Sequence, residues 1–289
     1  MQHIKDESFG GERPLFRRRG LSLENISILA GESALKECSN VSAINCRFEG
    51  KYPFWHNEKF ELKSCTFAEG ARAAIWYSKN MKMSDCLVEA PKMFRDMSGI
   101  FIESSRFPNA QETLWHCSGI EARNSKFDRA DYLFLQSCDI LLENVEISGN
   151  YAFQYCRNVK VNNCVINSKD AFWNTENVTV CNSRLDGEYL AWHSKNLTLI
   201  NCEISGTQSL CYAKNLVMKN CRLAKDADLC FEYSTLDAEI EGAVRSVKNP
   251  DGGSISADFI GELILDEYCK NPKACKIEAN IGKSSVYEI

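Results

Sequence analysis

The chain has 289 residues, a formal net charge of -5 and no basic stripe, which excludes nucleic acid and anionic membrane surfaces as expected partners. Its first eight residues are mostly polar, and nowhere do about 18 apolar residues run together. We therefore expect neither a signal segment nor a membrane span, and a cytoplasmic location. The 15 cysteines are odd in number and form no CxxC pair, which predicts reduced, buried thiols and neither a metal site nor a cofactor.

A phrase of similar residues recurs along the chain, and we call the residue that opens each copy the anchor. Anchors lie 19 to 21 residues apart, which is the signature of a solenoid. Most are residue types that tolerate a left-handed backbone, so the anchor is predicted to have a positive φ. The anchors are Gly20, Asn40, Lys59, Asn80, Gly99, Gly119, Asp139, Asn158, Asn177, Asn196 and Asn215.

The residues after each anchor alternate between apolar and polar, as in a β-strand with one buried face. The first and third residues are nearly always apolar, for example Val159 and Val161 after Asn158. The fifth residue is often Asn, as at Asn182 and Asn201, and such amides can hydrogen-bond from one repeat to the next. We therefore predict a bend with an asparagine ladder, followed by a small and then a large core residue.

A second turn and a second apolar segment complete each repeat. The turn carries small residues such as Gly31 and Ala71, and the segment carries apolar pairs such as Leu133 and Phe134. Each repeat is thus expected to hold about three short strands that run in the same direction in every copy. Because parallel crossovers are overwhelmingly right-handed, the pattern predicts an all-β fold, a single-stranded right-handed parallel β-helix of about 11–12 rungs of 19–21 residues.

The repeat also predicts the domain organisation. We expect one domain over residues 1–289, because each rung of a solenoid buries its surface only against its neighbours. Residues 1–10 are predicted to close one end and residues 11–245 to form the rungs. After the turn signal NPDGG at 249–253, the segment 246–289 is predicted to supply strands that close the other end.

Equivalent positions of successive repeats form columns along the chain. Two adjacent columns just before the anchors contain all five tryptophans and three of the four histidines, and these are the residues best suited to binding or catalysis. We call them the indole column, four residues before the anchor, and the polar column, three residues before it. In the first half of the chain the indole column contains Phe16, Lys36, Trp55, Trp76, Arg95, Trp115 and Leu135, and the polar column contains Arg17, Glu37, His56, Tyr77, Asp96, His116 and Gln136. Strand alternation lets only one of the two columns face solvent squarely.

The polar column offers an acid/base site. Equivalent residues of neighbouring rungs lie about 5 Å apart, which would bring Glu37 beside His56 and Asp96 beside His116. A carboxylate bonded to one imidazole nitrogen makes the ring a competent general base. We therefore treat these four residues as candidate catalytic residues. The alternative is a surface ladder of paired polar groups with no chemical role.

The indole column offers a binding surface. Exposed indoles on a rigid sheet stack on sugar rings, whereas buried ones fill a corner of the helix, and the sequence leaves both open. The tryptophans and charges concentrate in the amino-terminal half, which is therefore the candidate site. The candidate substrate-binding residues are Trp55, Trp76, Tyr77, Trp115, Arg72, Lys92 and Glu112, and Lys36 and Arg95 join the candidate catalytic residues as cations for a sugar carboxylate.

Carboxyl spacing restricts the reactions that this face could perform. An inverting glycosidase needs two carboxyl groups about 6.5–9.5 Å apart, and a retaining one needs about 5–5.5 Å. Glu37 and Asp96 are three rungs apart, or about 14 Å at the strand spacing, so they are not such a pair. A lyase needs a base and a cation instead. An enzyme of this kind would be a lyase or a glycoside hydrolase acting on an oligosaccharide.

Five sequence motifs are long enough to be specific to one protein family. They are GERPLF at 11–16, GESALKE at 31–37, YPFWH at 52–56, ARAAIWYS at 71–78 and APKMFRD at 90–96. They resemble a bacterial family catalogued only as domain-of-unknown-function family 3737, and the likeness covers nearly the whole chain, including SISADFIGELILD at 254–266. The resemblance implies a pectin-lyase-like fold, similar to that of pectate lyases and polygalacturonases. It brings no established reaction and no catalytic residues with it.

Two functions of different classes follow from these patterns. The first is a carbohydrate-active or carbohydrate-binding protein that uses the face between Glu37 and His116. The second is a non-catalytic scaffold that binds a partner, or another copy of itself, through the same face. The sequence leaves the oligomeric state open.

Overall fold

A computed structural model describes residues 1–286 of the chain, which divides into two compact units, residues 1–149 and 150–289. Each unit is a parallel β-solenoid, and together they comprise about 15 turns. The short 3-10 helix η1 (Glu69–Ala71) is the one helical element in the described part of the chain. No helix within residues 1–286 is long and apolar enough to cross a membrane.

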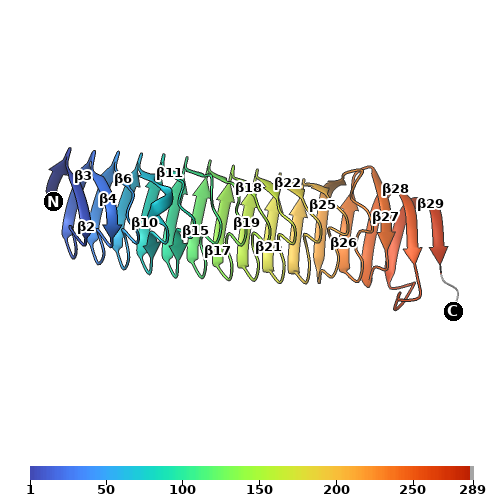
Figure 1. Cartoon of the computed structure of the whole chain (residues 1–289). Coiled ribbons are helices and arrows are strands. Elements are labelled where there is room, and N and C mark those ends of the chain that lie inside the picture. The colour runs from blue at the N-terminus through green and yellow to red at the C-terminus, as the bar shows by residue number, and fades with distance from the viewer. Residues whose placement is uncertain (287–289) are drawn as a thin grey trace. The chain divides into compact units, whose positions relative to one another are not determined.

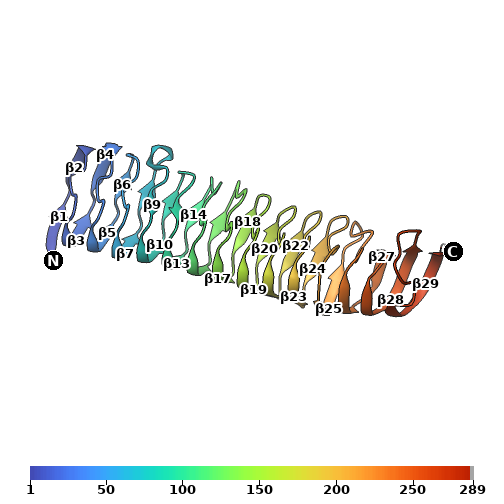
Figure 2. The same ribbon diagram turned by 90° about the horizontal axis from the view of Figure 1, so that it is seen from below.

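The amino-terminal unit winds as two parallel ladders, a long ladder that follows the anchors and a short ladder that follows the bend. The long ladder contains β1 (Gln2–Lys5), β3 (Arg19–Glu24), β5 (Ser39–Ile44), β7 (Glu58–Lys63), β10 (Lys79–Ser84), β13 (Ser98–Glu103), β15 (Ser118–Arg123) and β17 (Cys138–Glu143). The short ladder contains β2 (Ser8–Glu12), β4 (Ser27–Glu32), β6 (Arg47–Phe48), β8 (Thr66–Phe67), β11 (Leu87–Val88), β14 (Arg106–Phe107), β16 (Lys126–Phe127) and β18 (Glu146–Ser148). Figure 2 shows the two ladders on opposite edges, with β4 and β6 on one and β5 and β7 on the other.

The carboxy-terminal unit repeats this arrangement. Its long strands are β19 (Arg157–Asn162), β21 (Glu176–Cys181), β23 (Lys195–Ile200), β25 (Leu216–Leu223), β26 (Thr235–Ile240), β28 (Gly252–Leu265) and β29 (Cys275–Val286). Its short strands are β20 (Val165–Asn167), β22 (Arg184–Asp186) and β24 (Glu203–Ser205), and the six-residue strand β27 (Ala243–Lys248) pairs with β28. Figure 1 shows successive strands of this unit, such as β19 and β21, side by side and running the same way. Val178 of β21 pairs with Leu197 of β23, as the repeat period requires.

Residues that were expected to close the two ends form further rungs. In the amino-terminal unit, β1 pairs with β3 and β2 pairs with β4, both in parallel. In the carboxy-terminal unit, β28 pairs with β26 and β29 pairs with β28. The number of turns therefore exceeds the predicted 11–12. Residues 287–289 of the predicted closing segment lie outside the described residues.

The third segment of each rung differs from the prediction of three strands. Within residues 1–286 it forms named strands only at β9 (Ile75–Trp76) and β12 (Phe94–Arg95), which pair in parallel. The reason is visible at Tyr52 and His56, which both have a φ of 57°. Two left-handed residues so close together interrupt the extended backbone. The segment still faces the core, because Phe54 between them is fully buried.

Left-handed residues also mark the corners of every predicted rung. All eleven anchors have a positive φ, between 52° and 68°, which confirms the prediction made for them. The residue five places after each anchor is left-handed as well, and amides at this position bond between rungs. Asn45 Nδ2 donates to Asn25 Oδ1 at 2.8 Å, and Asn201 Nδ2 donates to Asn182 Oδ1 at 3.0 Å. These bonds hold successive bends in register.

The small and large core columns are buried as predicted. Phe48 stacks on Phe67 with ring centroids 4.7 Å apart, and both are fully buried. Of the 15 cysteines, 12 are buried. In the small column the thiol and hydroxyl groups also serve the backbone, since the N–H of Cys86 donates to Ser105 Oγ at 3.1 Å. This bond gives a reason for the repeated Cys and Ser at a position that a purely apolar residue could also fill.

Candidate functional site

The polar column faces solvent in the amino-terminal unit, and the indole column beside it is half-buried. His56, Tyr77, Asp96 and His116 are exposed, while Trp55 and its equivalents keep an intermediate exposure. The two columns do not alternate, because the polar-column residues are left-handed, with φ values such as 59° at Tyr77. Both columns can therefore reach one surface.

The indoles of this unit are held in place by their nitrogen atoms. Each Nε1 donates to a backbone carbonyl of the following rung. The bonds are Trp55 to Ala73 O at 2.6 Å, Trp76 to Lys92 O at 2.9 Å and Trp115 to Tyr132 O at 2.5 Å. Partial burial and these bonds give the tryptophans a structural role, and Trp55 and Trp76 also meet Tyr77 of the polar column at angles of 90° and 87°.

Four residues of the indole column form a continuous stack. The rings of Trp55 and Trp76 are nearly parallel, with centroids 5.5 Å apart and an interplanar angle of 8°. The Arg95 guanidinium lies 4.3 Å from the Trp76 centroid and 4.5 Å from the Trp115 centroid, so it makes a cation–π contact on both sides. Its Nε is buried and has no hydrogen-bond partner among the described residues. The stack is thus a rigid wall beside the polar column.

Two of the candidate cations, Lys92 and Arg95, contact an acid of the same unit. Glu112 Oε2 lies 2.9 Å from Lys92 Nζ and 4.0 Å from Arg95 Nη2. One carboxylate thus compensates part of the charge of two cations. Lys36 and Arg72 stand apart from this group, and neither has an ion-pair partner within residues 1–286. Arg72 is exposed at the C-cap of η1.

The polar column contains two contacting pairs on neighbouring rungs. The rings of His56 and Tyr77 stack with centroids 5.0 Å apart and an interplanar angle of 15°. Asp96 Oδ1 lies 3.3 Å from His116 Nδ1, which brings together the carboxylate and imidazole that the sequence places in register. The face therefore combines a flat aromatic surface with a carboxylate–imidazole pair.

Glu37 has a different partner from the one expected. Its Oε2 accepts a hydrogen bond of 2.6 Å from Arg17 Nε on the preceding rung, instead of contacting His56. This bond holds the pKa of the Glu37 carboxyl below its usual value. Arg17 was not among the candidate residues, although the polar column contains it. The long Arg17 side chain reaches Glu37 from the preceding rung. The repeat places Glu37 next to both Arg17 and His56, so the alignment of equivalent positions could not decide between these two partners.

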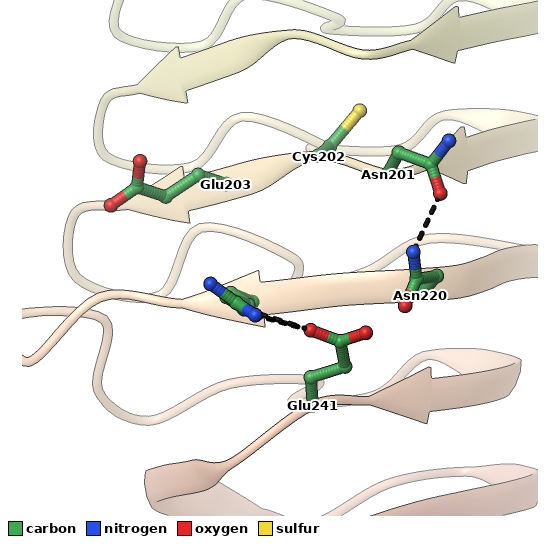
Figure 3. A pocket seen from close by; sticks show the side chains of 6 residues that line it. Asn201, Cys202, Glu203, Asn220 and Glu241 are labelled. Carbon is green, nitrogen blue, oxygen red and sulfur yellow. Dashed lines mark hydrogen bonds and ion pairs between the residues drawn. The ribbon is translucent and has the colours of Figure 1, made fainter.

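The carboxy-terminal unit contains a polar cavity of about 400 Å³ that the sequence did not indicate. Figure 3 shows its lining, with the Asn220 amide directed at Asn201 over a distance of 2.8 Å. Arg222 Nε and Nη2 lie 2.8 and 2.7 Å from Glu241 Oε2. Because these groups bond to each other, the cavity offers few free donors or acceptors for a ligand.

The described residues also show what the structure provides for a metal. No group of three or more His, Cys, Asp or Glu side chains within residues 1–286 is placed to hold a metal ion.

The fold and this face define a parallel β-solenoid protein with an exposed aromatic and polar surface. Residues 2–278 match the family described as protein of unknown function DUF3737, and the chain belongs to that family. The resemblance found in the sequence motifs is thus confirmed. No curated protein matches the sequence.

Solved structures of similar fold come from several kinds of protein. A mutant tailspike protein of E. coli bacteriophage HK620 in complex with a pentasaccharide aligns at a TM-score of 0.40 and 11% identity, over 92% of this chain and 65% of the tailspike chain. The A-module of the Azotobacter vinelandii mannuronan C-5 epimerase AlgE4 aligns at 0.29 and 8% identity, over 99% and 90%. The catalytic unit of a GH87 alpha-1,3-glucanase from Streptomyces thermodiastaticus aligns at 0.30 and 11% identity, over 92% and 64%. At these scores the similarities carry no argument about function.

Proposed function

We propose that this protein binds an oligosaccharide on the amino-terminal face formed by the indole and polar columns. The observation that carries the proposal is the exposed stack of Tyr77 on His56 beside the fixed indoles of Trp55 and Trp76. Tyr77 meets the Trp55 ring at 90°, so the rings form a corner and not a single plane. Such a corner offers a sugar ring an apolar face to stack on and polar groups at its edge.

The charges on this face favour binding over β-elimination. A lyase needs a free cation near the sugar carboxylate to stabilise the charge that develops there. Here Glu112 already contacts Lys92 and Arg95, and Arg17 is bonded to Glu37. The candidate cations without an ion-pair partner among residues 1–286 are Lys36 and Arg72, and neither lies on the rungs of Asp96 and His116. His56, Tyr77, Asp96 and His116 present exposed hydrogen-bonding groups, which suit sugar hydroxyls.

The function is tested by titrating the protein with neutral and acidic oligosaccharides. We expect Tyr77→Ala to weaken binding about 3- to 10-fold, because an aromatic contact contributes about 0.5–1.5 kcal/mol. Leu87→Ala is a matched control, since Leu87 is also exposed but belongs to the short ladder. Fluorotryptophan NMR of the Trp76 signal locates the ligand. If no saccharide moves that signal and light scattering shows a stable dimer, the scaffold function replaces this proposal.

The contact between Asp96 and His116 favours a second candidate function, general base catalysis on the bound saccharide. Asp96 would fix the tautomer and the orientation of the imidazole, leaving the other nitrogen to accept a proton. We expect His116→Ala to abolish any turnover while changing the affinity less than Tyr77→Ala does. Reducing-end and absorbance assays on oligosaccharides check this expectation. A variant with unchanged turnover would leave binding as the function of the face.

A further inference from the structure

The carboxy-terminal unit contains a second aromatic surface, which an ion pair borders on one side. A cavity of about 370 Å³ is lined by His193, Tyr212, Lys214, Tyr233, Asp251 and Lys270. The first two residues continue the polar column, Lys214 follows Tyr212 on the same rung, Tyr233 comes from the next rung, and Asp251 and Lys270 come from the segments before and after β28. The cavity lies entirely within residues 150–286, so it is independent of the function proposed for the amino-terminal face.

Three rings form the floor of this cavity on successive rungs. The centroids of His193 and Tyr212 are 5.3 Å apart, and those of Tyr212 and Tyr233 are 5.2 Å apart. Burial raises the pKa of both tyrosines, so they stay neutral phenols that can donate a hydrogen bond. Trp192 packs against Tyr212 at 4.6 Å and supports the floor from the indole column.

The wall of the cavity is held by an ion pair. Lys270 Nζ lies 2.7 Å from Asp251 Oδ2 and 5.3 Å from the centroid of the Tyr233 ring. These contacts join the residue before β28 to the turn after it, across the edge of the aromatic floor. The ion pair therefore borders one side of a shallow, open depression over the rings, and its few polar groups converge on that depression.

The lining carries one positive charge without a partner. Asp251 compensates Lys270, whereas Lys214 is exposed and has no ion-pair partner within residues 1–286. Behind Tyr233, the buried Glu232 lies 2.8 Å from Lys248, which also lies 3.6 Å from Asp266. These inner carboxylates are thus already engaged, and the ammonium that remains available to a ligand is that of Lys214.

We propose that this cavity binds an acidic saccharide, with the sugar ring on Tyr212 and Tyr233 and its carboxylate on the Lys214 ammonium. The two phenols would bond to the ring hydroxyls, and Lys270 and Asp251 would close the side of the site. The aromatic rings favour a sugar because a sugar ring can stack on them. The ammonium of Lys214, which has no ion-pair partner among the described residues, favours a ligand with a carboxylate.

The test uses the full chain labelled with fluorotryptophan, which gives one NMR signal for each of the five tryptophans. Titration with galacturonate oligosaccharides is expected to shift the Trp192 signal, and uncharged oligosaccharides of the same length are expected to bind about 10-fold more weakly. Lys214→Gln should remove this preference. Lys195→Gln is the matched control, because the backbone of Lys195 pairs with that of Lys214 in a parallel β-bridge but Lys195 does not line the cavity.

The outcomes separate this site from the amino-terminal face. A shift of the Trp192 signal alone supports saccharide binding in this cavity. It does not bear on binding at the amino-terminal face, because Trp55, Trp76 and Trp115 report on that unit. The proposal is overturned if the acidic saccharide leaves Trp192 unmoved, if neutral and acidic saccharides bind equally, or if Lys214→Gln and Lys195→Gln lose the same affinity. Circular dichroism of both variants confirms that they fold.

Discussion

Replacing Gly253 with alanine is expected to lower the free energy of unfolding by about 3–5 kcal/mol. Gly253 has a φ of +98° where it pairs with Leu236, and a Cβ atom there would lie 1.8 Å from the Leu236 carbonyl oxygen. The atom it would meet belongs to the backbone of the neighbouring rung. The strand β26 or β28 therefore has to move, at the cost of hydrogen bonds in the ladder.

Gly242 provides the matched control for this substitution. It also has a left-handed backbone, with a φ of +85°, but a Cβ atom added there would meet no atom of the described residues within 4 Å. Gly242→Ala therefore carries only the left-handed strain of about 1–2 kcal/mol. Urea denaturation, monitored by far-ultraviolet circular dichroism, measures the free energy of unfolding of both variants. Equal losses would show that backbone conformation, and not contact between rungs, decides the effect.

The repeat made the fold readable from sequence, because a period of 19 to 21 residues places like residues next to each other in space. Val178 and Leu197 were expected on neighbouring rungs and pair in register. The same argument brought Asp96 to His116, whose short side chains lie 3.3 Å apart. Period and residue type therefore decide contacts when the side chains are short.

Two features of the candidate sites could not be predicted. Alternation suggested that only one column faces solvent, but His and Tyr do not reveal in a sequence that their backbone is left-handed, as it is at His56 and Tyr77. The cavity in the carboxy-terminal unit depends on Asp251 and Lys270, which follow the point where the repeat becomes irregular. Without a recurring pattern, no register assigns such residues to a neighbour.

Phe127→Ala is expected to cost about 3–5 kcal/mol of stability, because it empties part of a core that neighbouring rungs cannot refill. Phe127 is fully buried, stacks on Phe107 at 4.5 Å and meets Phe134 edge-on at 6.3 Å. Rigid hydrogen bonding between the rungs keeps the ladders at their spacing, so the cavity left by the ring persists. Phe259→Ala is the control, since that ring is 43% exposed and its loss should cost less than about 1 kcal/mol. If urea denaturation shows comparable losses in the free energy of unfolding for both variants, the buried aromatic column does not stabilise the core more than an exposed ring does.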